Sequence, residues 1–373
     1  MTAINSAESV KRLYLNNETI EDSTIDIFNE SIVKFFKNAL KISLKKPNQA
    51  IFLLKTLRNQ RIAIKTRNRW KSNGIHVPAF LIFSITGRCN LKCKGCYAHA
   101  QHREKEKELD TIRIRRLFQE AAELGISMIL IAGGEPMLRP ELFEITKDFP
   151  EIIFAIFTNG TLLDNTVIEK IKKQRNVVPL LSTEGFEHET DDRRGDGIYR
   201  KLRLLMDKLW ENNIFFGTSL TLTSTNYSLI TNELFVEDFV KKGCKVFIYV
   251  EYVPVREGTE HLELNLDQTK KIPELMDSLR IKYPSLFVAF PGDEEKLGGC
   301  LSSGRGFLHI SPEGRIEPCP FAPYSDTNIK DVSLKEALQS KLLLKIRENH
   351  DELKETTSGC ALWEKREWVK SLL

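Results

Sequence analysis

No part of the 373-residue sequence is apolar for long enough to cross a membrane, because every apolar run stops short of about 18 residues. The N-terminal stretch, MTAINSAESVKRLYLNNETIEDS, also lacks the apolar centre of a secretory signal peptide. Internal repeats of solenoid period and low-complexity tracts are missing as well. These absences argue against a membrane-spanning, secreted or repeat protein and predict a globular protein of the cytoplasm.

The seven cysteines lack the even number and the wide spread of a disulfide framework. Three of them lie within eight residues, and three more lie within the last 75 residues. An odd number of clustered cysteines in an apparently cytoplasmic chain indicates metal or redox chemistry rather than covalent crosslinking.

Acidic residues are absent from residues 34–71, a segment that contains twelve Lys or Arg residues. The net charge of the whole chain is only +4, so the remainder is net acidic by eight charges. A basic segment near the N-terminus therefore precedes a mildly acidic body.

The same basic segment has the apolar spacing of amphipathic helices, predicted over residues 32–44 and 50–65. We interpret residues 1–77 as a basic helical extension. Its helices either pack on the rest of the protein with solvated charges, or associate through residues 32–71 with a membrane surface. The second alternative would make the protein peripheral at the inner membrane surface. Binding to nucleic acid is not expected, because no nucleic-acid motif is present.

Strands and helices alternate from Pro78 onward. Predicted strands are 80–85, 127–132, 152–158, 177–183, 215–222 and 245–252. Predicted helices are 111–124, 140–148, 164–172, 199–212, 232–242 and 267–281. Six βα units in series predict an α/β fold with a parallel sheet over residues 78–290.

The alternation fades beyond residue 290, which indicates a small C-terminal module over residues 291–373. Two short strands around a Pro-Glu-Gly turn are predicted within residues 307–319. A helix is predicted over residues 333–348, and Cys360 follows in a loop.

Cys89, Cys93 and Cys96 have the spacing C-x3-C-x2-C directly after the first predicted strand. Thiolates are the usual ligands of iron–sulfur clusters. Three nearby cysteines leave one iron of a [4Fe–4S] cluster open for a substrate. A zinc site with His99 as a fourth ligand, or a set of redox thiols, is the alternative.

Four later segments follow in the expected order and make residues 78–255 similar to the radical SAM superfamily, where SAM is S-adenosylmethionine. These segments are Gly133-Gly134-Glu135-Pro136, Thr158-Asn159-Gly160, Ser182-Thr183-Glu184-Gly185 and residues 190–199. One departure is Gly95, since many members carry an aromatic residue directly before the third cysteine. Here Tyr97 follows that cysteine instead, a variant familiar in the subgroup with C-terminal auxiliary clusters.

The resemblance implies a partial (βα)6 barrel whose cluster, held by Cys89, Cys93 and Cys96, reductively cleaves SAM to a 5′-deoxyadenosyl radical. The glycine pair lets the backbone approach a ligand closely, and Glu135 can accept hydrogen bonds from an ammonium group. Arg194 either pairs with the SAM carboxylate or forms a surface salt bridge. The residues expected to bind SAM are Tyr97, Gly133, Gly134, Glu135, Pro136, Ser182, Glu184 and Arg194.

The second cysteine set, Cys300, Cys319 and Cys360, resembles the auxiliary-cluster modules called SPASM and Twitch, which place a hairpin between a cysteine and a Pro-Cys pair. A full SPASM module uses more cysteines, so three residues imply one auxiliary [4Fe–4S] cluster at most. Its fourth ligand could be a non-cysteine residue, Cys244, or an open position. A zinc site or a module without a cluster is the alternative.

The resemblance thus predicts an iron–sulfur oxidoreductase that abstracts a hydrogen atom from a peptide or protein. A lipid-like or cofactor-precursor small molecule is the alternative substrate. A non-catalytic iron–sulfur or zinc protein is the outside alternative. A radical SAM enzyme also requires a low-potential electron donor of the flavodoxin or ferredoxin type.

Overall fold

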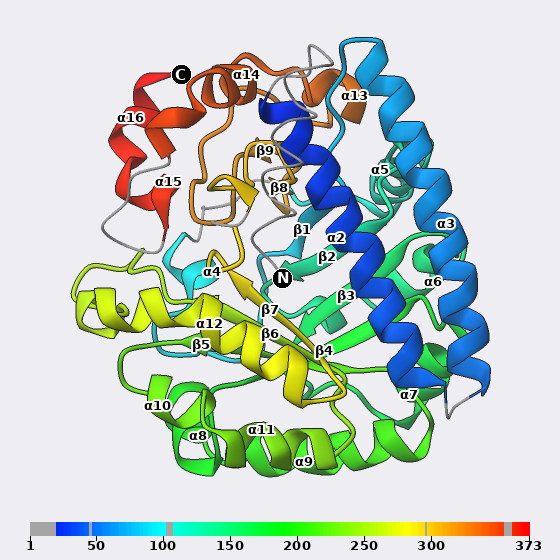
Figure 1. Cartoon of the computed structure of the whole chain (residues 1–373), viewed down its shortest axis with the longest axis vertical. Helices are drawn as coiled ribbons and strands as arrows, with labels where there is room; N and C mark the ends of the chain where they lie inside the picture. Colours follow the sequence, from blue (N-terminus) through cyan, green and yellow to red (C-terminus); the bar gives the residue numbers. More distant parts are fainter. Residues whose placement is uncertain (1–19, 45–46, 102–106, 295–296, 354–359) are drawn as a thin grey trace, which may run out of the picture.

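The computed structural model describes residues 20–44, 47–101, 107–294, 297–353 and 360–373. Within these residues the strands form one sheet, in the order β7-β6-β5-β4-β3-β2-β1-β8-β9, which curls into a half barrel (Figure 1). The strands are β1 (Phe80–Thr86), β2 (Met128–Gly133), β3 (Ile153–Thr158), β4 (Val177–Thr183), β5 (Gly217–Leu222), β6 (Val246–Glu251), β7 (Leu286–Phe290), β8 (Phe307–Ile310) and β9 (Ile316–Glu317).

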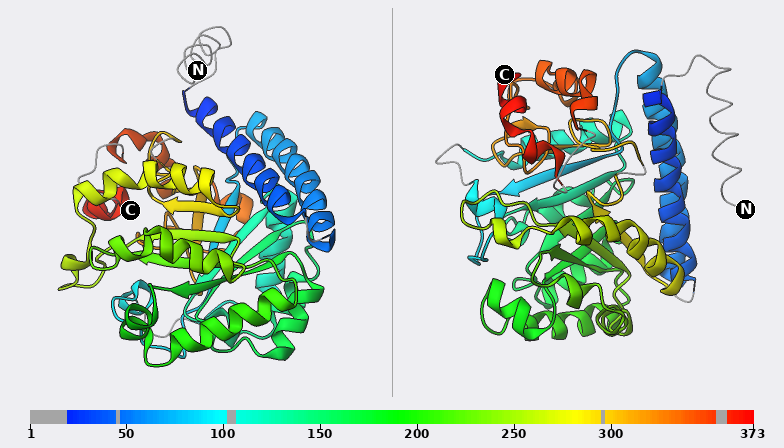
Figure 2. Two further views of the ribbon diagram at one scale, coloured as in Figure 1. Left: turned by 60° about the horizontal axis from the view of Figure 1, so that its bottom comes forward. Right: turned by 60° about the vertical axis from the view of Figure 1, so that its left-hand side comes forward.

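Helices connect successive strands and cover the convex side of the sheet (Figures 1 and 2). The longer helices are α2 (Ile20–Ser43), α3 (Pro47–Ser72), α5 (Thr111–Leu124), α7 (Asn165–Lys173), α8 (Glu187–Arg194), α9 (Ile198–Glu211), α11 (Glu233–Lys241), α12 (Leu266–Lys282) and α14 (Lys341–Glu348). Shorter ones are α4 (Tyr97–Ala100), α6 (Leu142–Thr146), α10 (Tyr227–Ile230), α13 (Leu334–Ala337), α15 (Ala361–Glu364), α16 (Arg366–Ser371) and the 3-10 turns η1 (Pro136–Leu138), η2 (Glu260–Leu262) and η4 (His350–Leu353).

The six strands predicted from the sequence correspond to β1–β6, which pair in parallel, so the α/β class is confirmed. The sheet has more parallel strands than the six predicted, because β7 continues it beyond β6. Its five residues lie directly before Pro291, and so short an apolar run is not distinct in sequence.

The C-terminal module extends the same sheet instead of standing apart from it. Strand β8 pairs in parallel with β1, from Phe80 with Phe307 to Phe83 with Ile310. Strand β9 then pairs with β8 in antiparallel fashion, as the predicted hairpin requires. The module therefore has a fixed position beside the first cysteine loop, which follows β1.

The predicted helix over residues 333–348 is two helices, α13 and α14. Ser340 separates them, because its hydroxyl accepts a hydrogen bond from the Leu343 amide and so caps the start of α14. Their buried leucines belong to the hydrophobic core, and α13 contacts α5.

The N-terminal helices cross the amino ends of the strands (Figure 2). Gln49 donates to the Asn213 carbonyl ahead of β5, and Ser127, just before β2, donates to Gln60. Arg67 donates to the Gly125 carbonyl at 2.6 Å. The basic extension thus packs on the barrel, at the end opposite to the carboxyl ends of the strands.

Part of the outer face of α3 stays apolar. Ile51, Leu54 and Ile62 are 54%, 55% and 52% exposed, and they alternate with exposed cations such as Lys55 and Arg58. Among the described helices, none is both long enough and apolar enough to cross a membrane. This stripe therefore lies on the surface of the protein.

Alanine substitutions at Gly125 and Gly74 test whether α3 packs against the turn at Gly125. Both residues have a left-handed backbone conformation, with φ of +84° at Gly125 and +77° at Gly74. A Cβ at Gly125 would lie 2.7 Å from the Ala63 carbonyl oxygen in α3, whereas a Cβ at Gly74 would meet nothing within 4 Å. Gly74→Ala should cost about 1 kcal/mol in unfolding free energy from the backbone conformation alone. Gly125→Ala should cost at least about 1 kcal/mol more in chemical denaturation. Equal losses would show that α3 is not held against this turn.

Candidate functional site

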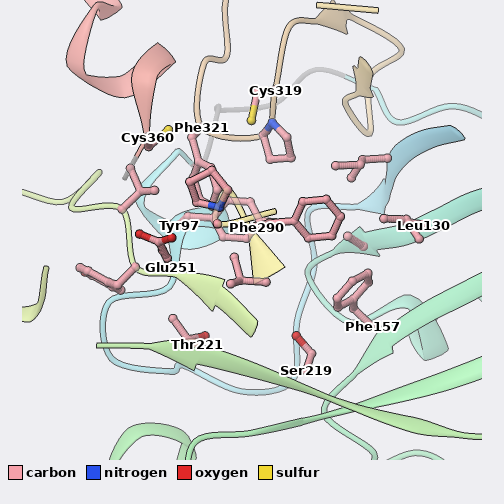
Figure 3. Close-up of a pocket in the computed structure, with 18 of the residues that line it drawn as sticks. Tyr97, Leu130, Phe157, Ser219, Thr221, Glu251, Phe290, Cys319, Phe321 and Cys360 are labelled. Carbon is pink, nitrogen blue, oxygen red and sulfur yellow. The ribbon is translucent and has the colours of Figure 1, made fainter. Parts of the chain in front are cut away.

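A cavity of about 730 Å³ opens at the carboxyl ends of the strands, where active sites of parallel sheets form. Both cysteine sets line it, although they are about 200 residues apart in sequence. Much of the remaining wall is apolar and aromatic, as Figure 3 shows for Leu130, Phe157, Phe290 and Phe321. The structure therefore joins the two predicted sites into one.

The first cysteine loop is fixed to the end of β2 by backbone hydrogen bonds. The Gly134 amide donates to the Thr86 carbonyl at 2.7 Å, and the Glu135 amide donates to the Arg88 carbonyl at 2.8 Å. A Cβ on Gly134 would lie 2.0 Å from the Arg88 carbonyl oxygen. Only glycine permits this approach, so the glycine pair predicted from sequence shapes the cysteine loop itself.

The Glu135 side chain is buried, and its carboxylate is hydrogen-bonded by other residues of the protein. Its carboxylate accepts hydrogen bonds from the Thr158 hydroxyl, at 2.8 Å, and from the Asn159 amide, also at 2.8 Å. The Asn159 side chain in turn donates to Asn90 in the cysteine loop at 2.9 Å. Burial raises the pKa of Glu135. Glu135 thus ties the ends of β2 and β3 to the loop while still lining the cavity.

Glu184 anchors two arginines. It is 2% exposed and receives Arg193 at 2.8 Å and Arg194 through a close contact of its other oxygen. Arg194 also lies 4.0 Å from Cys93 Sγ. The guanidinium of Arg194 is therefore positioned at the cysteine loop by an ion pair within the protein, and both arginines line the cavity.

Tyr252 lies against Gly95, the position where the sequence departs from the radical SAM pattern. A Cβ on Gly95 would lie 2.7 Å from the Tyr252 hydroxyl, so the tyrosine occupies the space of a larger side chain. Tyr97 packs edge-on against Phe321 of the C-terminal module, with ring centroids 5.2 Å apart. The Tyr252 hydroxyl is buried and has no hydrogen-bond partner among the described residues.

The second cysteine set lies deeper than the first. Cys319 follows β9, Cys360 precedes α15, and Cys300 lies in the loop before β8. Burial raises the pKa of the Cys360 thiol to about 12 and that of Cys319 well above its usual value. Such thiols become thiolates when a metal centre supplies compensating positive charge.

Two carboxyl groups that sequence reasoning missed face the same cavity. Glu251 ends β6 and is 4% exposed, and Glu294 is 6% exposed in the turn after β7. Burial, reinforced by Glu294, raises the pKa of Glu251 to about 8, and burial raises the pKa of Glu294 to about 8. The position of Glu251 at a strand end could have signalled it, whereas Glu294 follows a strand that was not predicted.

The donor chemistry of both cysteine sets fits iron–sulfur clusters. All six thiols are free of disulfides and line the cavity. No three His, Cys, Asp or Glu side chains of the described ranges converge closely enough for one metal ion. Sulfurs around a single zinc lie about 3.8 Å apart, since each bond is about 2.3 Å long, whereas ligands of a cluster bind separate irons and lie farther apart.

The cavity collects most of the residues predicted to bind SAM. It is lined by Tyr97, Gly133, Gly134, Glu135, Ser182 and Arg194. Pro136 and Glu184 are not part of its lining: Pro136 begins η1, and Glu184 holds the two arginines from behind. His99, considered as a zinc ligand, does not line the cavity either.

Comparison with known proteins agrees with this geometry. Residues 83–233 match the family model of the Radical SAM superfamily. The chain is 25% identical over 314 residues to the AdoMet-dependent heme synthase of Methanosarcina barkeri, covering 76% of this chain and 89% of that protein. It is 26% identical to the antilisterial bacteriocin subtilosin biosynthesis protein AlbA of Bacillus subtilis, covering 74% and 62%.

Among solved structures, Streptococcus suis SuiB bound to S-adenosylmethionine superimposes with a TM-score of 0.61 at 20% identity, covering 84% of this chain and 78% of SuiB. At that identity the likeness shows the fold alone. Fold and site define a radical SAM domain at the core of the chain. With its enzymatic relatives, the match makes the chain a radical SAM enzyme, and the family implies a [4Fe–4S] cluster and SAM.

Glu251 should make the stability of the metal-free chain depend on pH. Its carboxyl binds a proton more tightly in the folded state, where the pKa is about 8, than in the unfolded state, where it is near 4.5. Its contribution is therefore complete below the unfolded pKa and is lost as the pH rises toward 8. Glu251→Gln should reduce the fall in unfolding free energy between about pH 5 and about pH 8 by up to about 1.4 kcal/mol per pH unit. Identical pH profiles in chemical denaturation would contradict this assignment.

Proposed function

We propose that this enzyme cleaves SAM reductively at Cys89, Cys93 and Cys96 and modifies a peptide or protein substrate. We further propose a second, auxiliary [4Fe–4S] cluster at Cys300, Cys319 and Cys360. The observation that carries the substrate class is the buried carboxyl group of Glu251 in the wall of the cavity that both cysteine sets line. An external flavodoxin- or ferredoxin-type protein supplies the electron.

The chain's own residues position SAM and exclude water. Cys89, Cys93 and Cys96 would hold the cluster, which would supply the one-electron chemistry for reductive cleavage of SAM and for hydrogen abstraction from the substrate. The Gly133–Gly134 backbone lets a ligand approach the cysteine loop closely. Arg194, held by Glu184, presents positive charge to the SAM carboxylate. Apolar walls, including Phe157 and Leu130, keep bulk water from the reacting atoms.

Glu251 favours a substrate with N–H donors. The Glu251 side chain lies in the wall of the cavity (Figure 3), and its Oε1 is buried with no hydrogen-bond partner among the described residues. An unpaired buried acceptor costs about 1–3 kcal/mol, which a donor on the substrate would recover. Peptide amides and amino groups supply such donors, as expected of a relative such as AlbA, whose name refers to the biosynthesis of a bacteriocin.

A cofactor precursor of the tetrapyrrole type is the second candidate. The heme synthase relative and the aromatic wall of Phe157, Phe290 and Phe321 favour it. A molecule with several carboxylates would also need cations in the wall. Among the described lining residues, the two arginines lie at the first cysteine loop, where Arg194 is assigned to SAM, and Lys270 lies in the exposed part. The peptide therefore fits the charges of the cavity better.

Anaerobic incubation of the reconstituted chain with dithionite and SAM should yield 5′-deoxyadenosine. Cys93→Ala should lower the yield by at least about a hundredfold, since an iron cluster loses one of three ligands. Cys244→Ala is the matched control, because Cys244 is fully buried at the start of β6, away from the cavity, and should retain the activity. Absence of 5′-deoxyadenosine from the fully loaded parent would refute the reaction.

The substrate class follows from the same assay. Deuterium from an α- or β-deuterated peptide should appear in 5′-deoxyadenosine, whereas transfer from a deuterated tetrapyrrole instead of a peptide would establish the second candidate. Iron per chain should be about eight in the parent and about four in Cys300→Ala/Cys319→Ala. A parent with about four irons would remove the auxiliary cluster.

We also propose that the outer face of α3 binds an anionic membrane surface, which places the enzyme peripherally at the cytoplasmic face of the inner membrane. The exposed side chains of Ile51, Leu54 and Ile62 can enter the interface, while surrounding cations meet lipid phosphates. No acidic residue of segment 34–71 opposes this contact. Each cation near the surface contributes about 1 kcal/mol.

In a co-sedimentation assay, the full chain should therefore bind to vesicles that contain phosphatidylserine. It should bind far less to vesicles of pure phosphatidylcholine. Reversing Lys55, Arg58 and Arg61 to Glu should weaken the binding by at least about a hundredfold at low salt, on the electrostatic contribution above.

The same charge change placed elsewhere is the matched control. Lys201, Lys271 and Lys341 are exposed outside the N-terminal helices, and their reversal to Glu changes the net charge of the chain equally. This triple variant should keep most of the binding. Equal losses in both triple variants would indicate a response to net charge and contradict a specific membrane face.

A further inference from the structure

The end of the cavity beneath the C-terminal module gathers one carboxylate with three thiols. Glu294, Cys300, Cys319 and Cys360 all line this end. Three cysteines can bind only three irons of a [4Fe–4S] cluster, so the fourth iron needs a ligand from another residue or from a substrate. The sequence alone does not identify that ligand.

The Glu294 side chain interacts with the cysteine set. The Cys300 thiol donates to the Ser302 hydroxyl at 3.2 Å with the Glu294 carboxyl group beside it, and the charge of Glu294 acts on Cys319 and Cys360 as well. Glu294 therefore interacts with all three thiols of the set and lines the same cavity. At 6% exposure it cannot turn outward to solvent without opening the loop.

The surrounding backbone holds Glu294 in place. Its carbonyl accepts hydrogen bonds from the Leu297 and Gly299 amides at 2.9 and 3.0 Å, and its amide donates to the Pro291 carbonyl at 2.6 Å. The Arg305 guanidinium bonds several carbonyls of the same loop, among them that of Cys300 at 3.0 Å. These bonds hold Glu294 and the backbone of Cys300 close to each other.

The other candidate ligands are placed less well. Cys244 lies at the amino end of β6, whereas the carboxyl end of that strand, at Glu251, faces the cavity. The Cys244 thiol donates to the Val246 carbonyl at 3.3 Å and does not line the cavity. Glu251 acts on the charge of Cys360, but less strongly than Glu294 does.

We propose that Glu294 is the fourth protein ligand of the auxiliary cluster, so that all four irons are held by the chain. This inference rests on the auxiliary cluster of the proposed function. Carboxylate oxygen is an accepted ligand of metal centres when it is fixed in position, and the turn provides that fixation. A closed coordination sphere excludes direct binding of the substrate to an iron of this cluster.

The test isolates the auxiliary site in the full-length chain. A variant with Cys89, Cys93 and Cys96 replaced by Ala is reconstituted anaerobically with iron and sulfide, and should hold about four irons. The electron paramagnetic resonance spectrum of its reduced cluster is recorded with and without imidazole, a small ligand for open irons. We expect no shift, because Glu294 occupies the fourth site.

Glu294→Ala in the same background should open one iron, so that imidazole shifts the spectrum. Glu294→Gln keeps the shape of the side chain, and should give the same shift if alanine prevents folding. Glu251→Gln is the matched control: it removes a neighbouring buried carboxylate and should leave the spectrum insensitive to imidazole.

The outcomes separate this assignment from the proposal on which it rests. A triple-alanine chain without iron would overturn the auxiliary cluster and, with it, the role of Glu294. An iron-loaded cluster that responds to imidazole while Glu294 is intact would overturn the ligand assignment alone. Spectra of the Glu294 variants identical to that of their parent would do the same.

Discussion

The contact between Gly134 and the Arg88 carbonyl is the constraint on which the site depends. Because a Cβ would lie 2.0 Å from that oxygen, only glycine lets the end of β2 pass directly under the cysteine loop. The amides of Gly134 and Glu135 then hold the loop, and the Glu135 carboxylate carries the restraint to β3 through Thr158 and Asn159. Three cysteines on an irregular loop are thereby held by the ends of adjacent strands.

The pairing of β8 with β1 brings the second cysteine set into the same cavity. Since β1 leads directly into the first cysteine loop, a strand of the C-terminal module beside β1 brings Cys300 and Cys319 to the cavity that Cys93 also lines. The ring contact of Tyr97 with Phe321 joins the first cysteine loop to the C-terminal module. A substrate in this cavity can therefore meet both cysteine sets at once.

Local pattern was enough to predict β1–β6 and the first cysteine set, because alternation and spacing are properties of neighbouring residues. Contacts between residues that are far apart in the sequence could not be predicted from local pattern. Glu184 has the sequence context of a SAM ligand, yet its carboxylate is taken by two arginines. Gly95 is an unexplained departure until Tyr252 is seen to fill its space. Glu294 follows a five-residue strand that has no distinct pattern, so nothing in the sequence connects it to Cys300.

The amphipathic pattern of the N-terminal helices is compatible with two uses, and their placement bears on the choice of substrate. One face packs on the barrel at the amino ends of the strands, through Gln49, Gln60 and Arg67. The cavity opens at the carboxyl ends, on the opposite side of the sheet. A membrane bound by the outer face of α3 would thus lie away from the cavity, so it would hold the enzyme in place without delivering lipid to it. Membrane association and a water-borne peptide substrate are therefore compatible, whereas a lipid substrate would have to leave the bilayer to reach the cysteines.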